Sequence, residues 1–285
     1  MLLTSIQLTN CKALPKGSIG SLAPRVGGIE IIDTTPSSIE IAALVNVTNP
    51  TPYTATVPFV NIHVLCNGSV IGEATARDLA VKTGNNTNLR VSASWKPSMG
   101  GEEGIHRGRD LLSQYLSGFN TTLGVRAHRN SIPGQPLIGD ALSKLNITVT
   151  TPRLMLPGKD EDERTHFIRD ATFHVFSSTA TFTLVSPLQH NTLYIDWVNA
   201  TAYYNHTEPV GQIEYDLPIA APPGESTTPK LPVEWSMDSV GYEKLRKALG
   251  GNLKLDAKAV LKVRLGAWTE TLWYIGRGIG AGVRI

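Results

Sequence analysis

Cysteine is scarce in this sequence, which has only Cys11 and Cys66 among its 285 residues. That number excludes a small fold held together by several disulfides. The two thiols fall in the first half of the chain and could pair in an oxidising compartment. Lone cysteines are at least as often small buried apolar side chains, so both interpretations stay open. No CxxC spacing occurs and the seven histidines are scattered singly, so the sequence predicts neither a metal site nor a cofactor.

Charge of one sign is also lacking. Charged residues make up 18% of the chain and the formal net charge is +2, with no cluster of Lys and Arg in the sequence. Surfaces that bind nucleic acid or anionic membranes need such clusters on one face. We therefore expect no nucleic-acid partner. The hydrophobic share of 41%, without low-complexity runs, is typical of globular domains.

Long apolar runs are missing as well. No segment approaches the roughly 18 to 20 consecutive apolar residues that span a bilayer, and Met1-Leu2-Leu3 is too short for the core of a signal peptide. We expect this chain not to cross a membrane itself. Any membrane association would have to come through a segment absent from this sequence.

Motifs of catalysis are absent too. The chain contains no GxSxG, HExxH or SxxK pattern, each of which would supply an activated nucleophile or a metal-bound water. Lone histidines in predicted strands, such as His63, His128 and His174, are usually structural side chains. The sequence therefore predicts a protein that is not an enzyme.

The run from Gly276 to Gly282 contains alternate glycines and resembles a nucleotide-binding loop at first sight. Such a loop has to connect a strand to a helix whose N-terminus holds the phosphate, and only three residues follow Gly282. We favour alternate glycines in a terminal strand, which leave room for a close neighbour.

The strongest pattern in the chain is an internal repeat. Residues 38–95 return in degraded form at residues 179–235, with offsets of 138 to 140. The aligned positions are Phe59-Val60-Asn61 with Trp197-Val198-Asn199, Asn67 with Asn205, Gly72 with Gly211, Leu79 with Leu217, and Trp95 with Trp235. A repeat this long indicates two domains in tandem rather than a solenoid.

Within each copy the hydrophobic pattern is that of β-strands. Apolar residues alternate with polar ones in residues 39–47, 89–95 and, most clearly, 253–265, and this period of two is typical of a strand with one buried face. Further strands are expected at residues 60–65, 123–127, 145–149, 171–175, 180–185, 193–204, 210–217, 268–274 and 279–285. One helix is expected in each half, at residues 109–119 and 240–249.

A charged run from Pro157 to Arg164 separates the halves and reads as a solvated linker. It lacks the spaced ligands and the turn glycine of a calcium loop. The prediction is a mostly β protein of two tandem β-sandwiches, each with one short helix. The first domain would cover residues 1–156 and the second residues 157–285.

Acceptor sites for N-glycosylation are more frequent than chance predicts. The pattern Asn-x-Ser/Thr occurs at Asn46, Asn67, Asn85, Asn120, Asn146, Asn199 and Asn205. Random placement of the same residues would give roughly two or three sites. The excess indicates exposure to the secretory pathway, although Thr-rich strands also create such patterns by chance.

Several of these features resemble a known family. They are Asn49-Pro50 after a strand, the turn at Gly72, the helix that stops at Gly250-Gly251, and the ending from Leu253 to Ile285. Together they resemble the immunoglobulin-like β-sandwich of the late-embryogenesis-abundant type 2 (water-stress and hypersensitive-response) family. The resemblance is closest to a fungal branch of vacuolar-membrane proteins with one transmembrane helix and several lumenal domains. In the second copy the Asn-Pro step is replaced by Ser186-Pro187.

The resemblance implies a protein of the vacuolar membrane, facing the lumen, that is involved in terminating autophagy. It also implies a groove that holds lipid, and it supplies no catalytic residues. Our hypothesis is a non-enzymatic lumenal domain pair that acts through an unidentified protein partner or by binding or transferring lipid. The alternatives are a structural or adhesive cell-surface module, which would present a large exposed patch, and a glycan-processing enzyme, which would need paired carboxylates beside a cleft.

Overall fold

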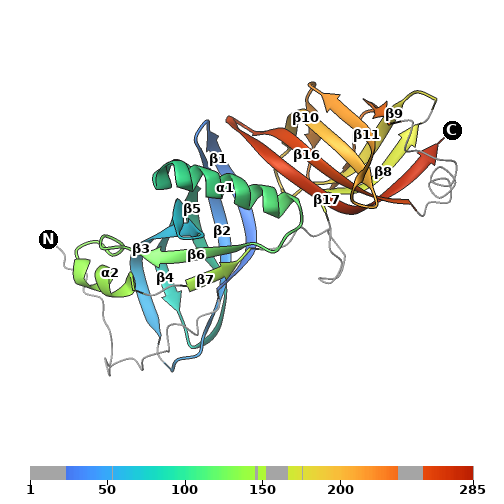
Figure 1. Ribbon diagram of the computed structural model, residues 1–285. Coiled ribbons are helices and arrows are strands. Elements are labelled where there is room, and N and C mark those ends of the chain that lie inside the picture. The colour runs from blue at the N-terminus through green and yellow to red at the C-terminus, as the bar shows by residue number, and fades with distance from the viewer. Residues whose placement is uncertain are drawn as a thin grey trace. The chain divides into compact units, whose positions relative to one another are not determined.

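The computed structural model describes residues 24–52, 54–144, 147–151, 166–174, 176–236 and 253–284. Their contacts divide them into two compact units, each built mainly of β-strands (Figure 1). Unit 1 holds residues 24–108 and 121–151, and unit 2 holds residues 109–120 and those from 166 onward. The predicted fold class, mostly β with two domains, is confirmed. The predicted boundary at residue 156 lies outside the described residues and stays a prediction.

Unit 1 is a closed barrel with the strand order β1-β2-β5-β4-β3-β6-β7. Closure comes from a parallel bridge between Arg25 of β1 and Thr150 of β7. The sandwich expected from the sequence is therefore a barrel in this unit. Its elements are β1 (Arg25–Thr35), β2 (Ser38–Asn49), β3 (Ala55–Cys66), β4 (Ser69–Val81), β5 (Gly84–Trp95), a 3-10 turn (Pro97–Gly100), α1 (Gly101–Leu116), β6 (Thr122–Ala127), α2 (Pro136–Leu142) and β7 (Ile147–Thr150).

Unit 2 is a ten-stranded sheet that curves into an open half-barrel (Figure 1). Its main path runs β13-β9-β8-β17-β16-β10-β11-β15. Its strands are β8 (Ile168–His174), β9 (Thr179–Val185), β10 (Leu193–Tyr204), β11 (Glu208–Tyr215), β12 (Ile219–Ala221), β13 (Glu225–Thr227), β14 (Leu231–Pro232), β15 (Glu234–Trp235), β16 (Leu253–Leu265) and β17 (Trp268–Arg284).

The two units share one topology. If β8, β9, β10, β11, β15, β16 and β17 are taken as equivalents of β1, β2, β3, β4, β5, β6 and β7, the cyclic strand order is the same in both. The last strand pairs in parallel with the first in each unit. The order therefore agrees with the duplication that the sequence predicts.

The aligned residues of the repeat occupy equivalent places. Gly72 pairs with Trp95 across β4 and β5, and Gly211 pairs with Trp235 across β11 and β15. Asn67 and Asn205 both begin a hairpin turn with a positive φ of 48°. These cross-strand pairs confirm the alignment at single-residue level.

The units differ at the strand that lies between the second and the fourth strand of each unit, which is β5 in unit 1. In unit 1, β5 pairs with β2 along almost its full length, from Gly84 to Trp95. In unit 2 the same stretch is divided into β13 and β14, which pair with β9, and β15, which pairs with β11. Prolines at 222, 223, 229 and 232 interrupt this stretch, and proline cannot donate to a strand ladder. The seam between β9 and β11 is therefore held by only a few pairs.

Residues 253–265 form one strand, as predicted. Buried Leu255, Leu261 and Val263 alternate along β16 with exposed Lys254, Lys258 and Lys262. The next two expected strands, residues 268–274 and 279–285, are instead one continuous strand, β17. A bulge at Asp256 and Gly278, where Gly278 has a φ of +64°, absorbs the irregularity without ending the ladder.

The expected helix at residues 109–119 begins earlier, at Gly101, and ends at Leu116. Gly104 and Gly108 lower its sequence signal but allow close approach, since a Cβ on Gly104 would lie 2.4 Å from the carbonyl oxygen of Pro97. Helix α2 lies between the strands expected at residues 123–127 and 145–149, where the sequence predicts no helix. The helix expected at residues 240–249 lies outside the described residues.

The second half of helix α1, from Arg109 onward, belongs to unit 2. There the backbone N–H of Trp273 donates to Ser113 Oγ at 3.1 Å, its indole N–H donates to Asp110 Oδ1 at 3.1 Å, and the N–H of Ile275 donates to Ser117 Oγ at 2.9 Å. Three polar contacts thus attach residues 109–117 to β17.

Candidate functional site

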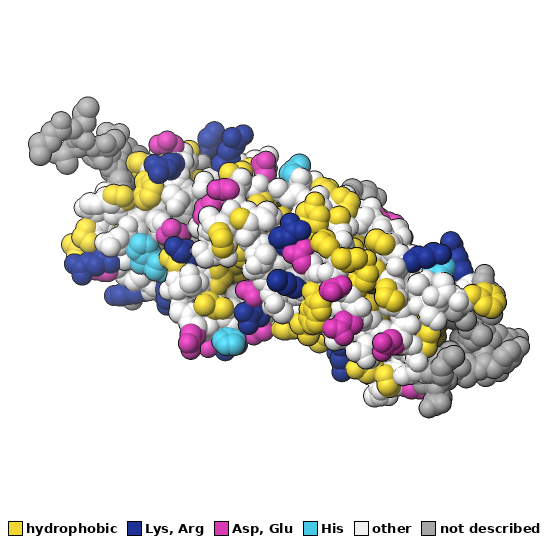
Figure 2. Space-filling view, turned by 90° about the horizontal axis from the view of Figure 1, so that it is seen from above, with side chains coloured by type: hydrophobic (Ala, Val, Ile, Leu, Met, Phe, Trp, Pro, Cys, Tyr) yellow, Lys and Arg dark blue, Asp and Glu magenta, His cyan; other side chains and the backbone are white. Residues whose placement is uncertain are grey.

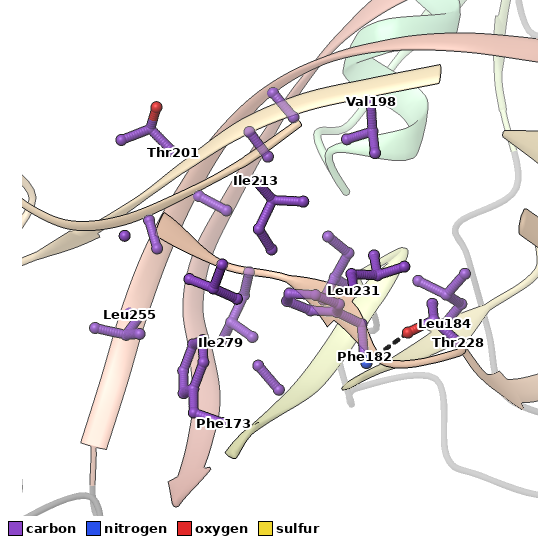
Figure 3. A pocket seen from close by; sticks show the side chains of 18 of the residues that line it. Phe173, Phe182, Leu184, Val198, Thr201, Ile213, Thr228, Leu231, Leu255 and Ile279 are labelled. Carbon is purple, nitrogen blue, oxygen red and sulfur yellow. Dashed lines mark hydrogen bonds between the residues drawn. The ribbon is translucent and has the colours of Figure 1, made fainter. Parts of the chain in front are cut away.

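The concave side of unit 2 contains an apolar cavity of about 90 Å³ (Figure 3). In Figure 3, Phe173, Leu255 and Ile279 lie at one end, Leu184 and Thr228 at the other, and Ile213 and Leu231 between them. A single water needs about 10 to 15 Å³ on this measure, so the cavity has room for several waters or for part of one acyl chain. Its nearly complete lack of polar lining favours hydrocarbon.

Small side chains create this space. Ala202 of β10 lies between Gly211 of β11 and Ala257 of β16, and Ala200 lies opposite Ala259 in the neighbouring row. All five residues line the cavity. Larger side chains here would meet across the concave face, so the cavity depends on these short ones.

Unit 1 carries larger residues at the equivalent places in its own strand. The offset that aligns Asn61 with Asn199 aligns Ile62 with Ala200 and Val64 with Ala202. The two copies therefore differ in side-chain volume at two positions where the backbone is alike.

The wall opposite the small residues comes from the interrupted fifth strand. Leu231, Val233 and Trp235 line the cavity from β14, β15 and the residue between them. Thr228, also in the lining, accepts a hydrogen bond from the Phe182 N–H at 3.0 Å and donates to the Pro229 carbonyl at 2.9 Å (Figure 3). Its hydroxyl is satisfied within the wall, so this side of the cavity is apolar in practice.

Trp235 is the exception among the lining residues. Its ring packs edge-on against Phe173, with 5.2 Å between the ring centroids. Its indole nitrogen is buried and has no hydrogen-bond partner among the described residues. By contrast, the indole of Trp273 in the same unit donates to Asp110.

One carboxylate, Asp256, is part of the lining. It is ion-paired with His206 and accepts a hydrogen bond from the Gly278 N–H at 3.0 Å. Burial alone would raise the pKa of Asp256, but the bonds from His206 and Gly278 outweigh it and lower the pKa below its usual value. A charged, single carboxylate does not make the carboxylate pair that a glycan-processing site needs.

The glycine run lies within β17. A Cβ on Gly280 would come 2.7 Å from Asp170 Oδ1 on the parallel strand β8, whereas a Cβ on Gly282 would meet no atom within 4 Å. The expected close neighbour is confirmed at Gly280 and is wrong for Gly282. From Gly276 to Gly282 the run is part of the paired strand β17, so it does not form a loop.

The predicted glycosylation sites differ in how far they are exposed to solvent. Asn67, Asn85, Asn120 and Asn205 are exposed, while Asn46 and Asn199 are half-buried within strands. Asn146 and Cys11 lie outside the described residues. Cys66 is buried at the end of β3. Because Cys11 is outside the described residues, the pairing of the two cysteines stays a prediction.

Two of the histidines form a cluster in unit 1. The rings of His63 and His128 stack with 4.3 Å between centroids, and His128 Nε2 lies 3.0 Å from Asn61 Oδ1. Burial, then the neighbouring His128 and Arg126, lower the pKa of His63, and Glu73 opposes them only in part. His174, in contrast, stands apart in β8 of unit 2 with a buried Nε2 that has no partner among the described residues.

The His63 cluster gives a prediction for pH. A histidine whose pKa is lower in the folded state stabilises the fold fully above its unfolded pKa of about 6.5, and this contribution is lost as the pH falls through the folded pKa. Unit 1 should therefore lose stability on acidification below pH 6.5. His63→Gln should reduce that loss in urea unfolding at pH 7 and pH 5. An unchanged pH dependence in the variant would contradict the prediction.

Two further findings concern the described residues only. They contain no group of three or more His, Cys, Asp or Glu side chains arranged to hold a metal ion. None of their helices combines the length and the apolar composition that a bilayer crossing needs. On the face in Figure 2, basic and acidic side chains are interspersed rather than gathered by sign.

Comparison with known families gives two matches. A model of the Tag1-like fourth LEA-2 like domain matches residues 22–139. A model of the Tag1-like fifth LEA-2 like domain matches residues 160–273. Among curated protein sequences, none matches the chain significantly.

Proposed function

This chain belongs to the Tag1-like family with tandem LEA-2-like domains, and on that premise we propose that it is a non-catalytic pair of lumenal domains at the vacuolar membrane. We propose further that unit 2 holds an acyl chain of a lipid in its cavity. The resemblance to fungal vacuolar proteins, rather than the geometry, supports a role in regulating autophagy. A protein partner and a membrane anchor outside this chain are part of the same proposal.

The apolar cavity is the observation that carries the lipid proposal. Its lining combines aromatic and aliphatic side chains with short ones that keep the centre open. Burial of hydrocarbon from water stabilises a complex by about 0.8 kcal/mol for each CH₂ group. A solid core at the same place would instead support a structural or adhesive module.

The proposal is tested by binding of dansyl-labelled undecanoic acid to the full chain, after extraction of any co-purified lipid. We expect saturable binding of one probe molecule per chain and displacement by unlabelled decanoic acid. Mass spectrometry of the extract should identify acyl lipids that co-purify. Absence of saturable binding would favour the structural or adhesive alternative.

The lumenal placement gives a prediction for the glycosylation sites. A glycan is compatible with the fold where the side chain projects into solvent, as it does at the exposed Asn67, Asn120 and Asn205. Asn199 lies in β10 between β11 and β16, half-buried, and should stay unmodified. After expression through a secretory pathway, enzymatic deglycosylation in ¹⁸O water followed by peptide mass spectrometry reports each site. Modification of Asn199 alone, or of no site, would contradict the prediction.

A further inference from the structure

Trp235 has a hydrogen-bond donor that finds no partner in the described part of the chain. The indole nitrogen is buried, and no acceptor for it exists among the described residues. Buried polar groups are nearly always paired, because an unpaired donor loses its bonds to water without replacement. An unpaired donor in the wall of a cavity therefore indicates a group that a ligand completes.

The surroundings of Trp235 fit this role. The residue lies beside Gly211 in the row that continues to Ala202 and Ala257, so the open centre of the cavity is next to its ring. A Cβ placed on Gly211 would lie 3.5 Å from Cε3 of the Trp235 ring. Phe173 holds the ring from another side.

The same row ends near the charged groups of unit 2. Ala257 follows Asp256, which is ion-paired with His206 and lies close to Arg277. The opposite end of the cavity, at Leu184 and Thr228, has its polar atoms satisfied within the wall. An amphipathic ligand would thus find its polar contact at the Trp235 end and hydrocarbon contacts beyond it.

We infer that Trp235 orients the ligand by donating its indole N–H to a carbonyl or carboxylate oxygen of an acyl chain. Free fatty acids and lipid esters share this chemistry, whereas plain hydrocarbon lacks it. The inference rests on the proposed function, because it requires an acyl chain in the cavity. It goes further by assigning the ligand class and the end at which its oxygen lies.

The test compares Trp235→Phe with the unchanged full chain. Phenylalanine keeps an aromatic ring and its contact with Phe173 but removes the donor. The probes are decanoic acid, methyl decanoate and n-decane, each measured by displacement of the dansyl-labelled chain. One lost hydrogen bond corresponds to about a threefold to tenfold loss of affinity. We expect that loss for the acid, the ester or both, and unchanged affinity for n-decane.

The three probes separate the possible failures. Loss with the acid alone identifies a free carboxylate as the partner, and loss with both oxygenated probes identifies the shared carbonyl. Equal affinities of variant and unchanged chain for all three probes would overturn the inference while leaving the cavity as the binding site. Failure of every probe to bind the unchanged chain would overturn the proposed function itself.

A second measurement does not depend on the stability of the variant. In ¹H–¹⁵N spectra of the full chain, the indole N–H resonance that Trp235→Phe removes is assigned to Trp235. Decanoic acid should shift this resonance downfield, as a new hydrogen bond does, and n-decane should not. An equal shift with both probes would contradict the inference.

Discussion

Replacement of Ala200 by Ile and Ala202 by Val should abolish acyl-chain binding and leave unit 2 folded. These are the residues that unit 1 carries at the equivalent positions, Ile62 and Val64. The added carbon atoms would fill the centre of the cavity and displace about four CH₂ groups of a bound chain. At about 0.8 kcal/mol for each group, affinity should fall by at least about 100-fold.

The free energy of unfolding of the Ala200/Ala202 double variant should stay nearly unchanged or should increase. Filling a cavity commonly stabilises a domain by about 0.5 to 2 kcal/mol when the new side chains fit. Val260→Ile is the matched control, because Val260 is on β16 but 43% exposed, outside the cavity lining. Binding of the dansyl-labelled chain measures the first effect and urea unfolding the second. Unchanged binding by the Ala200/Ala202 double variant would rule out this cavity as the site.

Gly72→Ala should destabilise unit 1 by about 3 kcal/mol, the upper range for forcing a methyl group into a packed site. A Cβ at this position would lie 2.2 Å from the backbone carbonyl oxygen of Ser94, and a backbone atom in a barrel wall cannot move aside cheaply. The expected result is a clear fall in the urea midpoint of the transition that reports unit 1.

Gly211→Ala, the same change at the equivalent position, supplies the control. There the nearest atom is the Cγ1 methyl of Val233 at 3.1 Å, a side chain in a wall of short strands. We expect a cost of about 1 kcal/mol or less. Equal effects at Gly72 and Gly211 would contradict the idea that the two walls differ in rigidity.

Much of the fold follows from the sequence because strands with one buried face have a period of two. Residues 253–265 alternate except at the exposed Val260, and the strand has those bounds. The pattern fails where local signals and packing disagree. Gly276 and Gly278 suggest an end to the strand, yet pairing with β16 on one side and β8 on the other continues past them.

Helix α1 illustrates the opposite error. Gly101, Gly104 and Gly108 have low helix propensity, so the sequence indicates a start at residue 109. The helix begins eight residues earlier because Gly104 and Gly108 allow its backbone to approach Pro97, and Gly104 also allows it to approach Val70. A close approach between distant segments leaves no periodic signal in a sequence.

The sequence predicts only part of the candidate site. The repeat aligns Gly211 with Gly72 and Trp235 with Trp95. Nothing in a single sequence shows that the indole N–H of Trp235 finds no acceptor among the described residues. The cavity itself depends on Ala202 and Ala257 lying side by side, which follows from strand pairing. An alanine in an alternating strand reads the same whether its neighbour is large or small.

The interrupted fifth strand also bears on how much unit 2 can hold. In a closed barrel the circumference is fixed by an unbroken ring of hydrogen bonds, so the interior has one size. In unit 2 the corresponding stretch pairs with β9 through three residue pairs of β13 and two of β14, and with β11 through two of β15. Separation of those pairs would leave the pairing of β10, β16, β17 and β8 with one another intact. We expect such a half-barrel to bind acyl chains of different lengths, and to release them, while these four strands stay folded.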